Sequence, residues 1–297
     1  MIVVPSAKCF STYNPRAEVA VFGTKRSSGT FGASSSAGAA SNSGAFRVDW
    51  WDGTTTTYSA DTNLQYITKA IVAPYNTTAE KRFSITPVNS SGQQSGQLTQ
   101  IVFSASVRSP ISFIDIRGLS KLESFLCEAG TDLTSYTHNG RIGVLSLTST
   151  GLTSINFPEG SLTYSATFNY SNSLATINGV QNLKRLESFR VRSCAVTSLD
   201  FSNLSSLFHI DALGTPLTSI RAQNCTLASN SYSSYSYFLG GALLGQTNLD
   251  RTAIVQFFND LGNANGYINV AASLGAASLT SSDIAIATGK GYTVLGA

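Results

Sequence analysis

The chain has 297 residues, a formal net charge of +3 at pH 7 and a charged fraction of 12%, about half the usual share. Lys and Arg form no continuous stripe, which argues against nucleic acid as a partner, and no stretch approaches the roughly 20 apolar residues of a membrane-spanning helix. Ser, Thr, Asn and Gly replace the missing charges, a composition typical of exported, cell-surface or virion proteins rather than of cytosolic enzymes.

Residues 1–14 show no clear hydrophobic period and are predicted to be an N-terminal arm that contacts a neighbouring protein. The segment lacks the basic and apolar regions of a secretory signal. If Met1 is the native start, the protein is therefore expected to stay in the cytoplasm where it is made. Assembly of a virus particle inside a host cell reconciles this start with the extracellular type of composition.

Residues 15–107 are predicted to form an Ig/PKD-like β-sandwich of about seven short strands. Residues 30–42, rich in Gly, Ala and Ser, are expected to be a weak strand or a flexible loop. The other expected strands are Ala17–Phe22, Phe46–Trp50, Thr54–Tyr58, Leu64–Val72, Arg82–Thr86 and Ile101–Phe103.

The stretch Phe46-Arg-Val-Asp-Trp-Trp-Asp-Gly-Thr54 resembles the W-x-F-G-D-G-T core of polycystic-kidney-disease-type domains. It resembles more closely the V-D-W-G-D-G-T variant found ahead of repeat domains in bacterial surface and phage proteins. Trp51 replaces the usual Gly, and the match is good over one strand and one turn. The resemblance implies that Asp52 and Gly53 make the turn and that Trp50 packs between sheets. Calcium binding at Asp49 and Asp52 is the alternative, but turn formation explains both residues.

Residues 108–247 are predicted to form a repeat array, because one phrase recurs at a nearly fixed interval. The copies begin at 133, 152, 174, 196 and 217 and read L-T-S-Y, L-T-S-I, L-A-T-I, V-T-S-L and L-T-S-I. Their steps of 19, 22, 22 and 21 residues are too short for a helix pair and fit one strand plus one return segment per coil. Stacked coils of this kind share one hydrophobic core and present a long, stiff surface.

The residues ahead of each phrase resemble the leucine-rich repeat, L-x-x-L-x-L-x-x-[N/C]-x-L. The matches in the second, fourth and fifth copies are Ile142, Leu145, Leu147, Thr150 and Leu152; Leu186, Phe189, Val191, Cys194 and Val196; and Leu207, Ile210, Ala212, Thr215 and Leu217. The third copy is aligned on Tyr164, Asn172 and Leu174, which puts Thr167 and Asn169 at inward positions. The first copy, shifted by one residue, is aligned on Leu122, Phe125 and Leu133. The Asn, Cys or Thr of the pattern is expected to bind backbone groups where a strand ends.

Four cysteines, Cys9, Cys127, Cys194 and Cys225, lie far apart without a C-x-x-C pair and are predicted to be free and mostly buried. Cys194 is expected to be one of the strand-end residues rather than a reactive thiol. Asp200 and Asp211 are expected in loops or at the rim of the array, and Tyr164 in the core.

Residues 248–297 are predicted to be a small α/β end cap that covers the last coil. The expected order is a helix from Leu249 to Leu261, a strand at 266–270, a helix from Ser281 to Ala287 capped near Ser282 or Asp283, and a strand at 292–295. This order resembles the unit "helix, G-x-I/L-x-V/L, helix, K-G-W/Y-x-V" that ends repeat arrays in bacterial and phage proteins. The overall fold class is therefore mainly β with minor α.

No catalytic site is predicted. His138 and His209 are the only histidines, and neither is near a nucleophile motif. His209 falls between inward Leu207 and Ile210, so it is expected to point outward. No metal-ligand spacing and no phosphate-binding loop are present, so no metal and no cofactor are expected. A glycan-cleaving enzyme would need two carboxylates about 5–10 Å apart, and the spacing suggests no such pair.

The segment 230–238 mixes Tyr and Ser as antibody loops do, and is the predicted contact surface. Its candidate residues are Tyr232, Tyr235, Tyr237 and Phe238. Tyr170 is expected to point outward and to extend this surface. The alternative is that the four aromatic residues line the junction between the array and its end cap.

The sandwich, the capped array and the start without an export signal together resemble structural proteins of tailed-bacteriophage virions: tail-fibre, baseplate or capsid-decoration proteins. The resemblance implies a non-enzymatic protein, present in many copies, whose arm and sandwich contact other virion proteins. Its repeat surface would contact a host glycan or protein through many weak interactions. The alternative is a bacterial cell-surface leucine-rich-repeat adhesin. The expected location is accordingly the virion, assembled in the host cytoplasm, or else the bacterial surface, with no nucleic acid bound and no membrane insertion.

Overall fold

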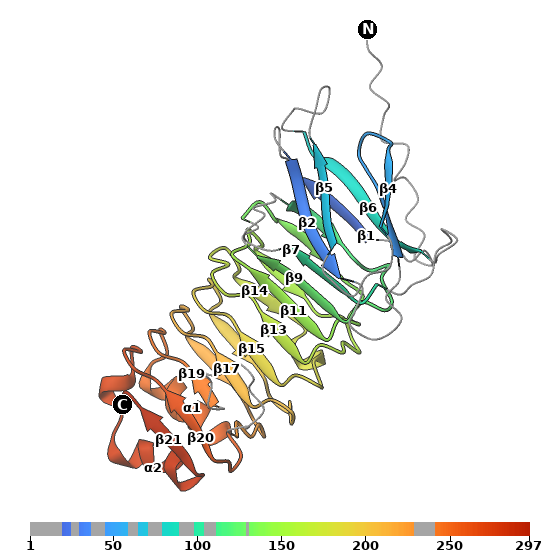
Figure 1. Cartoon of the computed structure of the whole chain (residues 1–297). Coiled ribbons are helices and arrows are strands. Elements are labelled where there is room, and N and C mark those ends of the chain that lie inside the picture. The colour runs from blue at the N-terminus through green and yellow to red at the C-terminus, as the bar shows by residue number, and fades with distance from the viewer. Residues whose placement is uncertain are drawn as a thin grey trace.

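The computed structural model describes residues 20–24, 30–36, 45–58, 65–70, 79–88, 98–103, 111–128, 131–228 and 241–297. The described chain is mainly β with few helices, as predicted, and it forms an elongated stack (Figure 1). The N-terminal strands lie at one end of the stack and the two helices at the other. The predicted arm lies outside the described residues.

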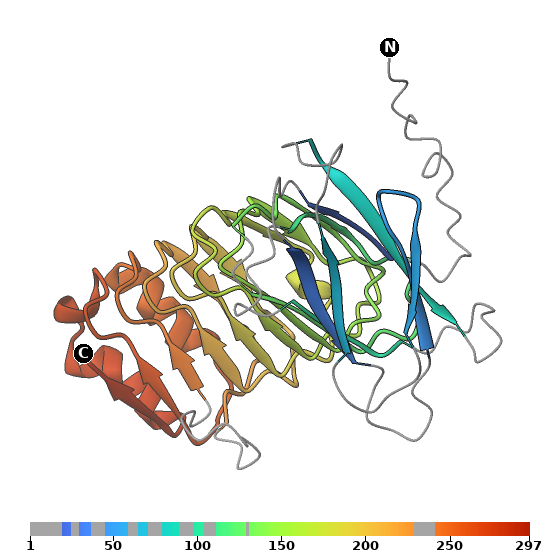
Figure 2. The same cartoon turned by 45° about the horizontal axis from the view of Figure 1, so that its top comes forward.

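The N-terminal strands divide between two sheets, which Figure 2 shows as two layers. The first sheet has the order β10-β8-β1-β6-β3-β4, with bounds β1 (Ala20–Thr24), β3 (Ala45–Asp49), β4 (Thr55–Tyr58), β6 (Lys81–Val88), β8 (Ile111–Asp115) and β10 (Ser135–Thr137). The second sheet begins with β5 (Gln65–Ala70), β2 (Thr30–Ser36) and β7 (Gln100–Phe103). The strands expected before residue 104 are thus all found, and the weak strand at 30–42 is β2.

The turn between β3 and β4 has the chemistry that the family resemblance implies. Asp52 Oδ1 accepts hydrogen bonds from Thr54 N at 3.1 Å and from Thr54 Oγ1 at 2.7 Å. Gly53 has a φ of 80°, a conformation that favours glycine. Trp50 is buried, its ring centroid lies 5.4 Å from that of Phe83, and its Nε1 donates to a threonine hydroxyl at 2.9 Å. The Asp and Gly therefore form the turn, and the Trp packs in the core.

From residue 124 onwards the chain winds in coils, each of which adds one parallel strand to the second sheet. These strands are β9 (Ser124–Glu128), β11 (Val144–Thr148), β13 (Ser165–Thr167), β15 (Ser188–Arg190), β17 (His209–Asp211), β19 (Gly241–Leu243), β20 (Gly266–Asn269) and β21 (Tyr292–Leu295). The result is an eleven-stranded sheet, here called the long sheet, that runs from β5 to β21.

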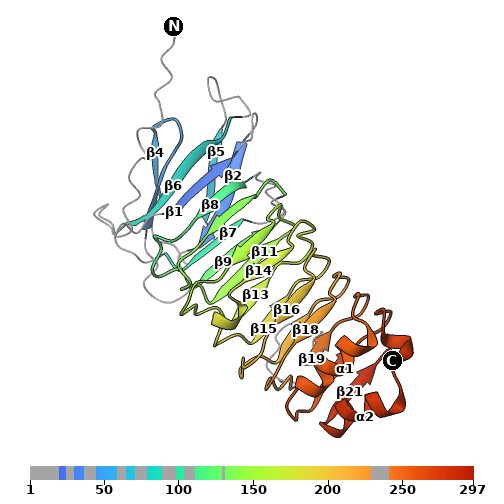
Figure 3. The same cartoon turned by 180° about the vertical axis from the view of Figure 1, so that it is seen from behind.

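The first copy of the repeated phrase forms β10 of the first sheet, and each later copy forms a second, short strand on the opposite side of its coil, as Figure 3 shows. These strands are β12 (Ser154–Asn156), β14 (Thr176–Asn178), β16 (Ser198–Asp200) and β18 (Ser219–Arg221), paired as β12–β14 and β16–β18. The expectation of one strand and one return segment per coil was therefore incomplete. Short 3-10 turns lie at η3 (Val180–Asn182) and η4 (Ala276–Ser278).

In the last two coils, helices take the place of the short strands. α1 (Arg251–Asp260) packs against β18, and α2 (Ser281–Gly289) packs against β21. Thr280, not Ser282 or Asp283, is the N-cap of α2, because its hydroxyl accepts from Asp283 N while the Asp283 side chain accepts from Thr280 N.

The K-G-Y sequence at 290–292 fixes this end unit. Lys290 Nζ donates to the carbonyls of Phe258, Asn259 and Leu261 at 2.9, 2.7 and 2.6 Å, so it caps the end of α1. Gly291 has a φ of 94°. Tyr292 Oη donates to a backbone carbonyl at 3.1 Å and accepts from a backbone amide at 3.1 Å. Lys290 and Tyr292 thus join this last unit to the preceding coils.

The two N-terminal layers and the coils share hydrogen-bonded sheets. β7 pairs in parallel with β9, and β1 pairs antiparallel with β8. The amides of Glu123 and Ser124 also donate to Thr99 O, at 2.8 and 3.0 Å. The predicted boundary at 107/108 is therefore crossed on both sides of the molecule by strand pairing.

A row of rings runs through the core between the two sides of the coils. Neighbouring ring centroids are 5.1–6.2 Å apart along the sequence Phe125, Tyr136, His138, Phe157, Phe168, Phe189 and Phe201. Aromatic pairs at such distances add stability beyond the burial of their area. This row and the aliphatic inward residues form one core cluster that extends from the first strands to the last.

The strand-end residues of the repeat bind backbone groups, as predicted. Cys194 Sγ donates to Phe168 O at 3.0 Å, and Thr215 Oγ1 donates to Ala212 O at 2.6 Å. Burial raises the pKa of the Cys194 thiol to about 12, so it stays protonated. Cys127 and Cys225 are also free and buried, which confirms the prediction for every cysteine but Cys9, which lies outside the described residues.

The third copy was aligned in the wrong register. Its inward residues are Ala166 and Phe168, both fully buried, and not Thr167 and Asn169. Ser171, not Asn172, is its strand-end residue, and Ser171 Oγ donates to a backbone carbonyl of the preceding coil at 3.1 Å. Its first position is held by a buried threonine, Thr163, whose hydroxyl donates to Ile142 O at 2.7 Å. Polar residues at these positions concealed the pattern.

Candidate contact surface

The outer face of the long sheet is built from the side chains that alternate with the inward ones. Strand register aligns them in rows from β9 to β17. One row is Ser124, Val144, Ser165, Ser188 and His209; the next is Leu126, Ser146, Thr167, Arg190 and Asp211. The face is therefore mostly uncharged, and its ionic groups gather towards the C-terminal coils.

Tyr170 lies at one end of β13 and is exposed, as predicted. Its side chain is 56% exposed, and its φ of 60° is unusual for a residue with a side chain. Tyr170 N donates to Arg192 O at 2.7 Å, a bond that joins this turn to the next coil. The tyrosine ring is thus presented from a fixed turn.

Tyr164, expected in the core, lies instead at the other end of β13 and is 38% exposed. Its ring covers Gly143 of the preceding coil, since a Cβ at that glycine would lie 2.6 Å from Tyr164 Cε1. Tyr164 and Tyr170 therefore bracket the outer face of one strand, between whose ends lie the polar Ser165 and Thr167. A rigid aromatic ring beside hydroxyl groups is a common contact element of binding surfaces.

A buried ion pair lies two coils further on. Arg192 Nε donates to Asp211 Oδ2 at 2.5 Å, and Asp211 is 1% exposed. Burial raises the pKa of Asp211, although the charge of Arg192 opposes the shift. Asp211 was expected in a loop or at the rim, but it lies in β17. Its ion-pair partner, Arg192, belongs to the neighbouring coil.

The short-strand side carries a second polar surface, here called the hydroxyl face. Three rows cross it from the first to the fifth copy of the phrase: Thr134, Thr153, Ala175, Thr197 and Thr218; Ser135, Ser154, Thr176, Ser198 and Ser219; and Thr137, Asn156, Asn178, Asp200 and Arg221. All of these residues are exposed except the half-buried Arg221. Asp200, expected in a loop or at the rim, lies in β16. The hydroxyl face is thus a regular array with little charge.

Neither histidine is placed for proton transfer to a ligand. His138 is 7% exposed and stacks on Tyr136 in the aromatic row, and burial lowers its pKa to about 4. His209 has the expected outward register on the long sheet, but it is only 2% exposed. Burial, with the charges of Arg190 and Arg192, lowers the pKa of His209 to about 4 as well. Both imidazoles are therefore buried, neutral groups at pH 7.

Within the described ranges, no group of three or more His, Cys, Asp or Glu side chains is placed to hold a metal ion. Neither α1 nor α2, with 10 and 9 residues, is long and apolar enough to cross a membrane, and the described residues contain no other α-helix.

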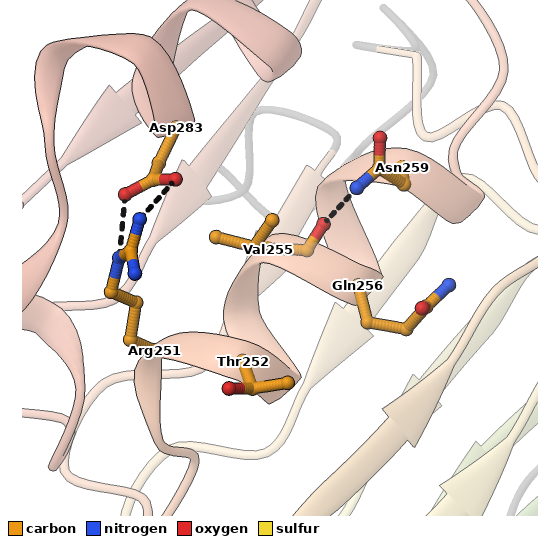
Figure 4. A pocket seen from close by; sticks show the side chains of 6 residues that line it. All are labelled: Arg251, Thr252, Val255, Gln256, Asn259 and Asp283. Atoms are coloured by element: carbon orange, nitrogen blue, oxygen red, sulfur yellow. Dashed lines mark hydrogen bonds and ion pairs between the residues drawn. The ribbon is translucent and has the colours of Figure 1, made fainter.

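A polar depression of about 220 Å³ lies on α1 beside the start of α2 (Figure 4). Its most prominent feature is the two-bond ion pair of Arg251 with Asp283, at 2.8 and 3.0 Å. This pair and the capping bonds from Thr280 hold the pKa of Asp283 well below its usual range. Gln256 points away from the pair and donates to Asp260 at 2.8 Å. The Arg251–Asp283 pair clamps α1 to α2, so the depression has a structural explanation.

Comparison of the sequence with protein-family models and with curated proteins, and of the structure with solved structures, finds no match.

Of the predicted contact residues, Tyr232, Tyr235, Tyr237 and Phe238 lie outside the described residues, and Tyr170 is exposed. Sequence reasoning missed Tyr164 because it assigned that residue to the wrong register. It also missed the hydroxyl face, although the signal was present in the repeated phrase itself. In L-T-S-I, the first and last residues point inward and the two between them point to solvent.

Proposed function

We propose that this chain is a non-enzymatic structural protein of a tailed-bacteriophage virion, of the tail-fibre, baseplate or capsid-decoration type. In this proposal the coils are a leucine-rich-repeat solenoid, and the two N-terminal layers are an Ig/PKD-like β-sandwich that joins the solenoid to the particle. The surface offered to the host is the solenoid, and its ligand is a host glycan or protein.

The observation that carries the proposal is the long sheet, which continues by hydrogen bonding from β5 to β21. A continuous sheet transmits position and load from one end to the other without a hinge. Parallel strands added one per coil, together with strand-end residues bonded to the backbone, support the leucine-rich-repeat assignment.

The chemistry of the surfaces favours a polar, uncharged ligand. Exposed hydroxyls and amides of the coils form hydrogen bonds with sugar hydroxyls or backbone groups, and the tyrosines at 164 and 170 supply flat apolar area. Individual contacts of this type are weak. Many copies on one symmetric particle make them strong together.

Mass spectrometry of purified particles and of the host envelope tests the proposal. The expected result is the protein in particles at a fixed copy number, in proportion to the known structural proteins. Absence from particles, together with display on a cell surface, would overturn it and favour the leucine-rich-repeat adhesin.

A binding assay tests which surface is used. The full-length protein is applied to host cells, and Tyr164→Ala with Tyr170→Ala is compared with Thr197→Ala on the hydroxyl face. The proposal places the ligand beside β13 if the tyrosine variant alone loses binding. If neither variant binds less than the wild type, the coils described here are not the contact surface.

A further inference from the structure

The last strand of the long sheet has an open edge. Within the described residues, β20 is the only strand paired with β21. Leu295 O accepts from Val270 N at 3.0 Å, so Leu295 bonds towards β20, and the alternation of a strand turns the amide and carbonyl of Val294 outwards. The strand reads Y-T-V-L and has no Pro or charged residue to block pairing. Such an edge is a template for another strand.

Large apolar side chains are exposed in this C-terminal unit. Leu274 is 72% exposed and Leu295 is 43% exposed. Leu274 N donates to Thr247 O of the preceding coil, and Leu274 directly follows the strand-end residue of its own coil. Earlier coils hold small or polar residues or proline at this position: Gly151, Asn172, Ala195, Pro216 and Asn248. A large apolar side chain occurs here only in the last coil.

The helix at this end has an uncharged outer side. α2 reads S-S-D-I-A-I-A-T-G, and of its residues only Asp283 and Ala287 are buried. Its exposed residues are Ser281, Ser282, Ala285, Thr288 and Gly289, and Ile284 and Ile286 remain half-buried. This side therefore offers hydroxyl groups and partly covered apolar area to a contact.

The end is also free of uncompensated charge. Residues 266–297 contain two charged side chains, Asp283 and Lys290. Asp283 is paired with Arg251, and the Lys290 ammonium donates to three carbonyls at the end of α1. The side chains of two identical ends therefore meet without repulsion between like charges.

We propose that a second copy of this chain covers the C-terminal end, with β21 antiparallel to the β21 of its partner about a two-fold axis. A two-fold contact uses the same patch on both copies. The open edge, the apolar side chains and the neutral surface each meet this requirement, since each matches an identical copy of itself. The pairing extends the long sheet through the interface and buries Leu274, Leu295 and the outer side of α2. It is independent of the virion assignment.

Sedimentation-equilibrium analysis of the full-length chain tests the pairing. The wild type is expected to be in a concentration-dependent equilibrium between monomer and dimer. Leu295→Lys and Leu274→Lys are expected to weaken the dimer by about tenfold or more, because each substitution acts twice in a two-fold contact and an edge lysine opposes strand pairing. Thr197→Lys on the hydroxyl face adds the same charge far from the end and is expected to leave the dimer unchanged.

Circular dichroism of each variant shows that the monomer remains folded, as expected for substitutions of exposed residues. A wild type that stays monomeric to the highest soluble concentration would overturn the proposal. So would a dimer that Leu295→Lys and Leu274→Lys leave intact, since its interface would then lie elsewhere. A partner protein of another sequence that binds a monomeric wild type at this end would equally refute pairing between copies.

Discussion

Removal of one ring from the middle of the aromatic row is expected to destabilise the protein at both ends of the stack. Phe189 is fully buried, and its ring centroid lies 5.9 Å from that of Phe168 and 5.1 Å from that of Phe201. Two ring contacts contribute about 0.5–1.5 kcal/mol each, and complete truncation of a buried Phe costs about 3–5 kcal/mol. We therefore expect Phe189→Ala to lower the free energy of unfolding by about 4 kcal/mol, and Phe189→Leu by about half of that.

Urea unfolding followed by two probes measures both the size and the reach of this effect. Far-UV circular dichroism reports on all strands, whereas fluorescence reports on Trp50 and Trp51, the only two tryptophans, at the turn between β3 and β4. If the shared sheets couple the N-terminal layers to the coils, Phe189→Ala shifts both midpoints together. With a slope of about 1–3 kcal/mol per molar urea, 4 kcal/mol corresponds to a shift of more than about 1 M.

Tyr170→Ala is the matched control, because that ring is 56% exposed and its loss should cost less than about 0.5 kcal/mol. A loss below about 1 kcal/mol for Phe189→Ala would refute the packing argument. A shift in circular dichroism with an unchanged fluorescence midpoint would refute the coupling between the two ends.

Three further substitutions test local features. Lys290→Met removes three hydrogen bonds to the end of α1 and is expected to lower the free energy of unfolding, measured by heat or urea, by about 2 kcal/mol. The control Lys184→Met, on the exposed surface, should lower it by less than about 0.5 kcal/mol. Equal losses of stability would contradict the capping role of Lys290. Gly151→Ala places a Cβ 2.2 Å from a backbone carbonyl and should destabilise the protein by about 1–3 kcal/mol. At Gly289 a Cβ meets nothing within 4 Å, so Gly289→Ala should stabilise the protein by up to about 1 kcal/mol. Stability changes of the same sign for both variants would contradict the tight stacking of the coils. His138 has a folded-state pKa of about 4, so between pH 6.5 and pH 4 the unfolded state binds more protons and stability falls on acidification by up to about 3 kcal/mol. In the His138→Gln variant, the number of protons taken up on unfolding in this pH range should fall by about one. A dependence of stability on pH equal to that of the wild type would place the imidazole in solvent.

The sequence predicts most of the stack because each coil repeats the same apolar spacing. Phe189 and Val191, or Ile210 and Ala212, occupy the positions that the pattern requires, and all four are fully buried. The cap is predicted equally well, since the helix at 251–260 and the strand at 292–295 have strong local signals.

The third copy shows where local pattern fails. Thr163 and Ser171 are polar, yet they are buried because the adjacent coil supplies carbonyl partners at 2.7 and 3.1 Å. Such partners become visible only when coils are stacked. The side chain of Tyr164 is apolar enough to fit the first inward position of the repeat. The sequence pattern alone therefore assigned Tyr164 to that position in place of Thr163.

The contact surface was the hardest part to predict, because it depends on which residues share a face across coils. The pairing of Arg192 with Asp211 joins residues of successive coils, and His209 is buried although its register is outward. Neither could be read from one strand. The regular spacing of the L-T-S-I phrase did hold the information for the hydroxyl face, because its two apolar residues mark the inward positions and leave the Thr and Ser between them for solvent.

The account depends on the N-terminal layers and the coils forming one hydrogen-bonded body, and native-state hydrogen exchange at the junction tests this directly. The amides of Glu123 and Ser124 donate to Thr99 O across the junction, as those of Phe208 and His209 donate to Glu187 O within the coils. The account predicts similar, strong protection for both pairs. Rapid exchange at Glu123 and Ser124 beside slow exchange at Phe208 and His209 would contradict it, because the two parts would then be separate domains on a linker.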